Sequence, residues 1–317
     1  MNAGVRFVAA DVDVFRILCA AELCHDIFWK VNENRSRFSG AGNVEGFFDD
    51  ASEIFTVSYR HAVFRDAAGD ADNINLLECI VSDEVAGYLS GEADNVFYTL
   101  AGPEISVATT KAYSTQLIAS YALAIQFAKV KGTISEEQYA AYIKELETLP
   151  DKIQRIIDDK ERIQWFASKQ ANAKDVFFIG RGIDYAICLE GSLKMKEISY
   201  IHSEAYAAGE LKHGTISLIE DGTLVIGVLT QPALYEKTVS NMVECKSRGA
   251  YLMGLTTFGN YNIEDTADFT VYMPKTDPHF ATSLAVIPLQ LLGYYVSVAK
   301  GLDVDKPRNL AKSVTVE

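Results

Sequence analysis

The sequence predicts an α/β protein with two doubly wound lobes built on parallel sheets, a helical connector between them and a C-terminal tail. Short apolar segments alternate with helical ones in the second half, and more weakly in the first, which is typical of parallel α/β folds. A length of 317 residues also suits two domains of about 150 residues each. We assign residues 1–134 to the first lobe, 135–170 to the connector, 171–300 to the second lobe and 301–317 to the tail.

In the first lobe, residues 4–10 and 51–58 are expected to be strands. Residues 95–100 form a third expected strand, because they are aromatic and β-branched and are followed by Gly-Pro. A long helix is expected from Val107, since its alanines and spaced apolar residues allow close packing. Gly132 is its expected stop.

The connector is expected to hold two helices, one from Ser135 that Pro150 ends and a charged one over 151–169 with a single apolar stripe. The second lobe then alternates between the two kinds of element. Its expected strands are 174–180, 223–230, 251–258 and 269–274, and its expected helices are 183–200, 233–248 and 280–299.

Composition and charge exclude several classes of partner. The net charge is −14 and no run of lysine or arginine occurs, which argues against nucleic acid and against an anionic membrane. The apolar stretch 284–299 is short for a membrane span and contains Pro288 and Gln290, so we interpret it as a buried helix. Five cysteines without metal-site spacing, and an N-terminus unlike a signal peptide, favour a cytoplasmic protein with reduced thiols.

Residues 189–214 are the candidate functional segment. Lys194 and Glu197 are three residues apart, so on a helix both side chains lie on one face. Together with His213 they could supply acid–base catalysis on a small substrate. The segment follows a strand that ends in Gly-Arg-Gly, so we expect the site at the carboxyl edge of that sheet, where open α/β sheets bind ligands.

Four stretches together resemble the glucosamine-6-phosphate synthase family. They are GPEISVATTKAYSTQL, GRGIDYAICLEGSLKMKEISYIHSEAYAAGELKHG, VIPLQLLGYYVSVAKGLDVD and the terminal PRNLAKSVTVE. The resemblance runs from about Glu92 to Glu317 and concerns the isomerase part of that family, which consists of two sugar-isomerase (SIS) lobes. It implies the conversion of fructose 6-phosphate and ammonia to glucosamine 6-phosphate, without a cofactor or a metal, by a homodimer.

The resemblance also implies roles for individual residues. Lys312 would form a Schiff base with the ketose, and Glu197 would move a proton between C1 and C2. His213 would open the sugar ring from across the dimer interface. Lys194 would assist proton transfer and Arg308 would steady the tail. The residues that would touch the sugar phosphate are Val107, Thr109, Ala311 and, as a remnant of the phosphate loop, Ser58.

Two features depart from the family pattern. No glutaminase domain precedes the isomerase part, so this chain would be a fragment or a stand-alone isomerase. The family's CGTS-like turn and SQSGET phosphate loop also correspond to residues 10–13 and 57–61, where Asp11 and Asp13 would repel phosphate. Either this lobe has lost its phosphate site or its first 91 residues are wrongly recorded. The abrupt change at about Glu92 favours the second explanation.

Simpler interpretations stand beside these assignments. Lys194 and Glu197 taken alone form an ordinary helix-surface ion pair, His213 taken alone is a turn histidine, and His202 is interpreted as structural. A Schiff-base lysine needs desolvation or a cationic neighbour to lower its pKa, and Arg308 is the only candidate in the sequence near Lys312. The sequence has no GxSxG, HExxH or P-loop motif. Two alternative functions stay open: a stand-alone SIS sugar-phosphate isomerase or deglycase, and a non-catalytic sugar-phosphate-binding protein.

Overall fold

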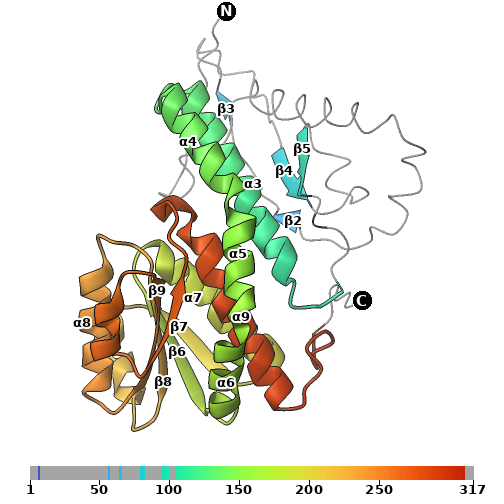
Figure 1. Ribbon diagram of the computed structural model, residues 1–317. Helices are drawn as coiled ribbons and strands as arrows, with labels where there is room; N and C mark the ends of the chain where they lie inside the picture. Colours follow the sequence, from blue (N-terminus) through green and yellow to red (C-terminus); the bar gives the residue numbers. More distant parts are fainter. Residues whose placement is uncertain are drawn as a thin grey trace, which may run out of the picture. The chain divides into compact units, whose positions relative to one another are not determined.

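The computed structural model describes residues 6–7, 56–57, 64–65, 79–82, 95–99, 101 and 105–310 (Figure 1). The chain divides into two compact units. The first comprises Met1–Ile105 and Thr109–Ile143, and the second comprises Ser106–Ala108 and Lys144–Glu317. The segment Ser106–Ala108 therefore belongs to the second unit, although the chain on either side of it belongs to the first.

Three described strands of the first unit, β1, β2 and β5, lie within the expected ones, whereas β3 and β4 were not expected. The parallel pair that a doubly wound lobe requires is formed by β4 and β5, with Cys79 opposite Asn95. Two short pairs, β1–β3 and β2–β4, are antiparallel. The strands are β1 (Arg6–Phe7), β2 (Thr56–Val57), β3 (Phe64–Arg65), β4 (Cys79–Ser82) and β5 (Asn95–Tyr98). The predicted phosphate-loop remnant Ser58 lies outside the described residues.

The long helix of the first unit, α3 (Thr110–Val130), begins three residues later than the sequence predicts. Its start is delayed because Thr109 has a left-handed backbone (φ 55°), a conformation that a threonine rarely adopts. The expected stop is confirmed: Gly132 follows the helix with φ 66°, where glycine is unstrained. The next helix, α4 (Glu136–Glu147), crosses from the first unit into the second.

The charged helix predicted over 151–169 is two helices, α5 (Leu149–Asp158) and α6 (Lys160–Gln170). The chain bends between them at Asp159, which has φ −96° and ψ 19°. The expectation that Pro150 ends the preceding helix is wrong, because α4 already stops at Glu147. Pro150 lies in the first turn of α5, where a missing N–H removes no helical hydrogen bond. The predicted apolar stripe is largely confirmed, since Ile156, Ile163 and Phe166 are buried.

The second unit is a parallel α/β fold, as predicted. Its five strands run in the order β10-β9-β8-β6-β7, and every neighbouring pair is parallel. Helix α8 lies on one side of the sheet, and α6 and α9 lie on the other (Figure 1). The elements are β6 (Asp175–Gly180), α7 (Ile183–Lys194), β7 (His202–Ala207), β8 (Leu224–Leu229), α8 (Tyr235–Lys246), β9 (Tyr251–Thr257), β10 (Phe269–Met273) and α9 (Ala281–Ala299).

The edge strand β7 is not among the strands that the sequence predicts. The strand is short and its sequence, HSEAYA, is largely polar. An edge strand pairs with a neighbour on one side only and is partly exposed, so it does not need a continuous apolar sequence. By contrast, all six residues of the central strand β8 are buried, which explains its continuous apolar sequence. Short helical turns join these elements: η3 (Leu211–His213), η4 (Thr215–Leu218), η5 (Tyr261–Asp265) and η6 (Pro278–Phe280).

Helix α9 is the long apolar helix that the sequence predicts to be buried. Within the described residues it belongs to the one segment, Pro278–Ala299, that is long and apolar enough to cross a membrane. However, 72% of the most apolar window of that segment is buried inside the protein, which fits a core helix. The two described cysteine side chains, Cys188 and Cys245, are also buried and form no disulfide.

Candidate active site

The candidate site lies where α7 changes its winding. At Lys194 the α-helix passes into a π-helix, η2 (Met195–Ser199), which carries Glu197. Such π-helical turns are rare and are often found at functional sites. The helix holds Lys194 and Glu197 next to one another, and it adds a third ionisable residue, Glu190, one turn before the lysine.

These three side chains form a compact charged group, which we call the Lys194 cluster (Glu190, Lys194 and Glu197). The ammonium Nζ of Lys194 lies 2.7 Å from Oε2 of Glu197 and 3.6 Å from Oε1 of Glu190. It also donates a hydrogen bond of 2.6 Å to the carbonyl oxygen of Ala108. The side chains of Lys194, Glu190 and Glu197 are only 6%, 9% and 23% exposed.

The surroundings of the Lys194 cluster raise the pKa of Glu190 above its usual value. Burial raises the pKa of Glu190, Lys194 lowers it in part, and the charge of Glu197 raises it again. Oε1 of Glu190 and Oε2 of Glu197 are buried and have no hydrogen-bond partner of good geometry, so their contacts with the ammonium are Coulombic. Buried carboxylate oxygens without hydrogen bonds are unfavourable for stability and are found at catalytic sites.

The position of the cluster corrects the expectation about the sheet edge. Helix α7 begins at the carboxyl end of β6, but it runs back across the sheet for 12 residues, or about 18 Å. Lys194 and Glu197 therefore lie at the other end of α7, shortly before β7 begins at His202. The expected position follows from the start of the helix, whereas Lys194 and Glu197 lie at its end.

The carboxyl edge of the sheet holds a different buried carboxylate, Asp184, in the first turn of α7. It accepts hydrogen bonds from the backbone N–H of Thr230 (2.9 Å) and from the hydroxyl of the same residue. Burial raises the pKa of Asp184 to about 6, and these hydrogen bonds limit the rise. Both partners of the carboxylate belong to the strand-end loop, so this group serves to join α7 to the end of β8.

His213 is on a different element from the Lys194 cluster and is the last residue of the turn η3. Its side chain is exposed, and its backbone N–H donates to the carbonyl of Glu210 (3.0 Å). Among the described residues, no hydrogen bond or ion pair joins His213 to Lys194 or Glu197.

The beginning of the tail is held near the cluster by backbone contacts. The N–H of Val107 donates to the carbonyl of Asp305 (3.0 Å), one residue from the Ala108 carbonyl that accepts from Lys194. Arg308 donates its backbone N–H to the hydroxyl oxygen of Tyr200 (2.7 Å), and its guanidinium lies 4.2 Å from the centre of that ring. The predicted site residues Ala311 and Lys312 lie outside the described residues.

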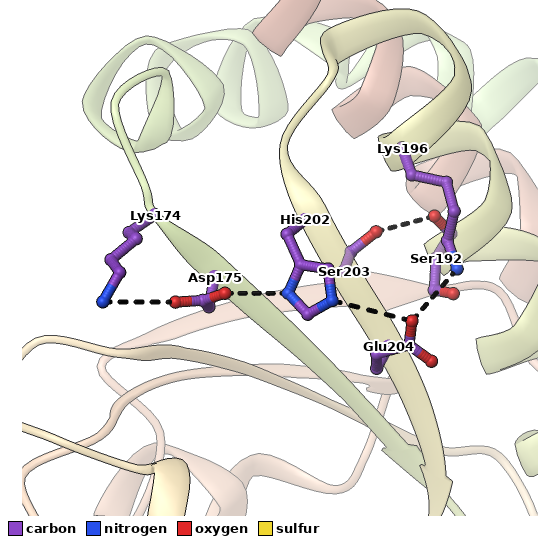
Figure 2. A network of polar contacts seen from close by, with 7 residues as sticks. All are labelled: Lys174, Asp175, Ser192, Lys196, His202, Ser203 and Glu204. Carbon is purple, nitrogen blue, oxygen red and sulfur yellow. Dashed lines mark hydrogen bonds and ion pairs between the residues drawn. The ribbon is translucent and has the colours of Figure 1, made fainter.

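A second polar group, the β7-edge network, lies on the surface a few residues along the chain. It runs from Lys174 through Asp175, His202 and Glu204 to Lys196 (Figure 2). His202 Nδ1 lies 2.8 Å from Asp175 Oδ1. Beside it, Ser203 donates to the carbonyl of Ser192 and ties β7 to α7. The exposure of His202 and its carboxylate neighbours favours the structural interpretation of this histidine.

Glu190 is the one member of the Lys194 cluster that is not among the site residues predicted from the sequence. The signal was present, since a glutamate four residues before a lysine on a helix faces that lysine. No group of three or more His, Cys, Asp or Glu side chains within the described part of the chain has the arrangement of a metal site.

Comparison with known proteins extends these observations. The model of the SIS domain family matches residues 170–300. The chain is 57% identical over 237 residues to the isomerising glutamine–fructose-6-phosphate aminotransferase of Caldanaerobacter subterraneus, and 56% identical over the same length to that of Clostridium tetani. Each match covers 75% of this chain, but the chain spans only 39% of each relative.

A solved structure agrees with these sequence matches. The C-terminal domain of glucosamine-fructose-6-phosphate aminotransferase from Francisella tularensis superimposes with a TM-score of 0.65 and 36% identity. The superposition covers 69% of this chain and 61% of that domain. The resemblance that the sequence motifs indicate is therefore confirmed for the isomerase region.

Proposed function

We propose that this chain is the isomerase part of an isomerising glutamine–fructose-6-phosphate aminotransferase. The first reason is that residues 170–300 match the SIS domain family. Its reaction would convert fructose 6-phosphate and ammonia to glucosamine 6-phosphate. The relatives that carry this name match over three quarters of the chain at 57% and 56% identity.

The observation that carries the proposal is the burial of the Lys194 cluster together with its two carboxylate oxygens that lack hydrogen bonds. An ion pair on a solvated surface would leave those oxygens in water. In the cluster, one ammonium neutralises two carboxylates only in part, so one carboxylate is available to accept a proton. This is the property that a general base requires.

In the proposed mechanism Glu197 takes a proton from C1 of the open-chain imine and returns it to C2. The C1–H electron pair forms a C1–C2 double bond, and the π pair of the C2 imine moves to the nitrogen, which takes up a proton. C2 then accepts the proton from Glu197 while the C1 hydroxyl loses its proton and becomes the aldehyde carbonyl. Lys194 holds Glu197 in place and is itself fixed by the Ala108 carbonyl. Glu190 adjusts the charge around Lys194, because it is the second carboxylate on the same ammonium.

The other assigned residues complete the proposed site. His213 of a second copy opens the sugar ring, and Lys312 forms a Schiff base with the ketose carbonyl as water leaves. Ammonia then displaces the Lys312 amine and gives the imine on which Glu197 acts. The sugar phosphate is bound by Thr109, the backbone at Val107 and Ala311, and Ser58. Arg308 steadies the tail through its contacts with Tyr200. No metal, cofactor, nucleic acid or membrane takes part.

The proposal includes a homodimer of cytoplasmic chains. Support comes from α7, whose outward side carries the exposed apolar residues Ile183, Leu189 and Leu193. Exposed apolar side chains gathered on one helix are typical of an interface. The helix that carries Lys194 would thus also contact the second copy, and an exposed His213 would be free to serve the neighbouring site.

We also propose the boundaries 1–134, 135–170, 171–300 and 301–317 as functional parts.

The test is to incubate the chain with fructose 6-phosphate and ammonium and to measure glucosamine 6-phosphate. Borohydride reduction during the reaction, followed by peptide mapping, should find a hexose phosphate on Lys312. Truncation after Leu310 removes Lys312 and should abolish both signals while the second unit stays folded. A truncated chain with full activity would refute the role of the tail.

A second candidate is a non-catalytic sugar-phosphate-binding protein. The observation that favours it is that residues 10–13 and 57–61 lack the phosphate-binding turns of the family, with Asp11 and Asp13 in the first of the two segments. Binding of fructose 6-phosphate by calorimetry without product or adduct would support this candidate. Product from another sugar phosphate, but none from fructose 6-phosphate, would indicate a stand-alone SIS isomerase or deglycase.

A further inference from the structure

Tyr200 has a backbone conformation that its residue type does not favour. It follows the last residue of η2 and adopts φ 60° and ψ 20°, which is a left-handed conformation. For a residue other than glycine, this conformation costs on the order of 1 kcal/mol. A glycine or asparagine would fit the backbone better, so a contact of the tyrosine side chain must offset the strain.

The side chain of Tyr200 makes two contacts with one residue of the tail. Its hydroxyl oxygen accepts the backbone N–H of Arg308 at 2.7 Å. Its ring lies under the guanidinium of Arg308, 4.2 Å from ring centre to Cζ, which is a cation–π contact. These contacts join residues that are 108 positions apart in the sequence.

The tail is also fixed a few residues earlier. Asp305 accepts the N–H of Val107 (3.0 Å), and the carbonyl of Val304 accepts the hydroxyl of Ser106 (3.2 Å). Asp303 closes a turn by accepting the N–H groups of Asp305 and Lys306, both at 3.0 Å. The tail is therefore held at two places, of which Tyr200 is the later one.

Each of these two anchor points leads to one residue of the Lys194 cluster. Val107 precedes Ala108, whose carbonyl accepts the hydrogen bond from Lys194. Tyr200 is three residues after Glu197, at the end of the same π-helix. The chain that continues toward Lys312 thus starts from a point that is fixed relative to the proposed acid–base group.

We propose that Tyr200 is a positioning residue that fixes the tail at Arg308 and thereby presents Lys312 to the substrate; this inference rests on the proposed function. Lys312 follows Arg308 by four residues in the sequence, so a fixed Arg308 leaves only a short stretch of chain before the lysine. Without the Tyr200 contacts the last anchor is Asp305, seven residues before Lys312, so a longer stretch of chain would separate the lysine from a fixed point. Tyr200 restricts the positions of the reactive lysine, which increases the rate of reaction with a bound ketose.

The first experiment compares residue-resolved amide hydrogen exchange in wild type, Tyr200→Phe and Tyr200→Asn. The Phe variant keeps the ring and removes the acceptor. The Asn variant removes the ring but tolerates a positive φ, so it does not add backbone strain. We expect the Arg308 amide to exchange at least tenfold faster in both variants, while the Val107 amide is unchanged. Tyr294→Phe, at an exposed tyrosine of α9, is the matched control.

The second experiment measures kcat and KM for fructose 6-phosphate with ammonium in the same proteins. A positioning role predicts kcat lower by about tenfold in Tyr200→Asn, less in Tyr200→Phe, and an unchanged KM. Equal kcat in all variants, or an unchanged Arg308 amide, would overturn the proposal. If wild type makes no product, the proposed function fails and the positioning role falls with it, while exchange still reports whether Tyr200 holds the tail.

Discussion

Two charged groups of similar composition lie close together in this sequence and differ in almost every physical property. The Lys194 cluster contains one lysine and two glutamates that are nearly or largely buried. The β7-edge network contains Lys174, Asp175, Lys196, His202 and Glu204 on the surface (Figure 2). Residue type alone does not separate them, because both combine lysines with carboxylates.

Burial and hydrogen bonding do separate the two groups. In the β7-edge network each charge has an opposite neighbour and water nearby, and such pairs contribute about 0–1 kcal/mol to stability. In the Lys194 cluster two carboxylate oxygens are buried without hydrogen bonds, which is unfavourable for folding. A buried charged group that is unfavourable for folding is therefore a stronger indication of function than a solvated network of the same residue types.

The largest stability difference is expected between two lysines that are two positions apart. Lys194→Met should lower the free energy of unfolding by about 3–5 kcal/mol, because it leaves Glu190 and Glu197 buried without a cation. Lys196→Met should change it by less than about 0.5 kcal/mol, since its ion pair is exposed. Urea unfolding measures both. If both substitutions lowered the free energy of unfolding by the same amount, the claimed difference between the buried Lys194 cluster and the exposed β7-edge network would be contradicted.

A smaller, pH-dependent effect is expected at the buried Asp184. Its pKa is about 6 in the folded protein and near 3.8 without burial, so the folded state binds the proton more tightly. Stability should therefore fall as pH rises from about 4 to 6, by about 3 kcal/mol for this group. Asp184→Asn should lack this dependence, whereas the exposed Asp265→Asn should keep it. Parallel curves for wild type and Asp184→Asn would contradict the assignment.

The smallest effect is expected in the β7-edge network itself. His202→Gln should change the free energy of unfolding by no more than about 0.5 kcal/mol and should leave turnover within twofold of wild type. The reason is that His202 is exposed and its carboxylate neighbours are solvated. Thermal unfolding at low and high salt, with an activity assay, checks both values. A large loss of turnover would mean that this surface takes part in the site.

The elements that the sequence predicts best are those with strong local signals. Helix α9 and the strands β8 and β9 have continuous apolar segments, and a parallel sheet buries both faces of its central strands. Strand β7 could not be predicted in this way, because its pairing with β6 is decided by tertiary position and not by composition.

The site shows the same division between local and tertiary information. The spacing of Lys194 and Glu197 places them on one helix face, and the structure brings them to 2.7 Å. The hydrogen bond from Lys194 to Ala108 joins residues 86 positions apart, so no local pattern could reveal it. The same holds for Tyr200 and Arg308, which are 108 positions apart and meet only because the tail folds back onto the end of η2.

The measurement that tests the account most directly compares Glu197→Gln with Glu204→Gln. The rate of glucosamine 6-phosphate formation and the binding of fructose 6-phosphate are measured for both. Removal of the general base should lower the rate about 10²- to 10⁴-fold in Glu197→Gln without loss of binding. Glu204→Gln, in the exposed network, should stay within twofold of wild type. A Glu197→Gln protein that turns over within a few-fold of wild type would contradict the claim that the Lys194 cluster moves the proton.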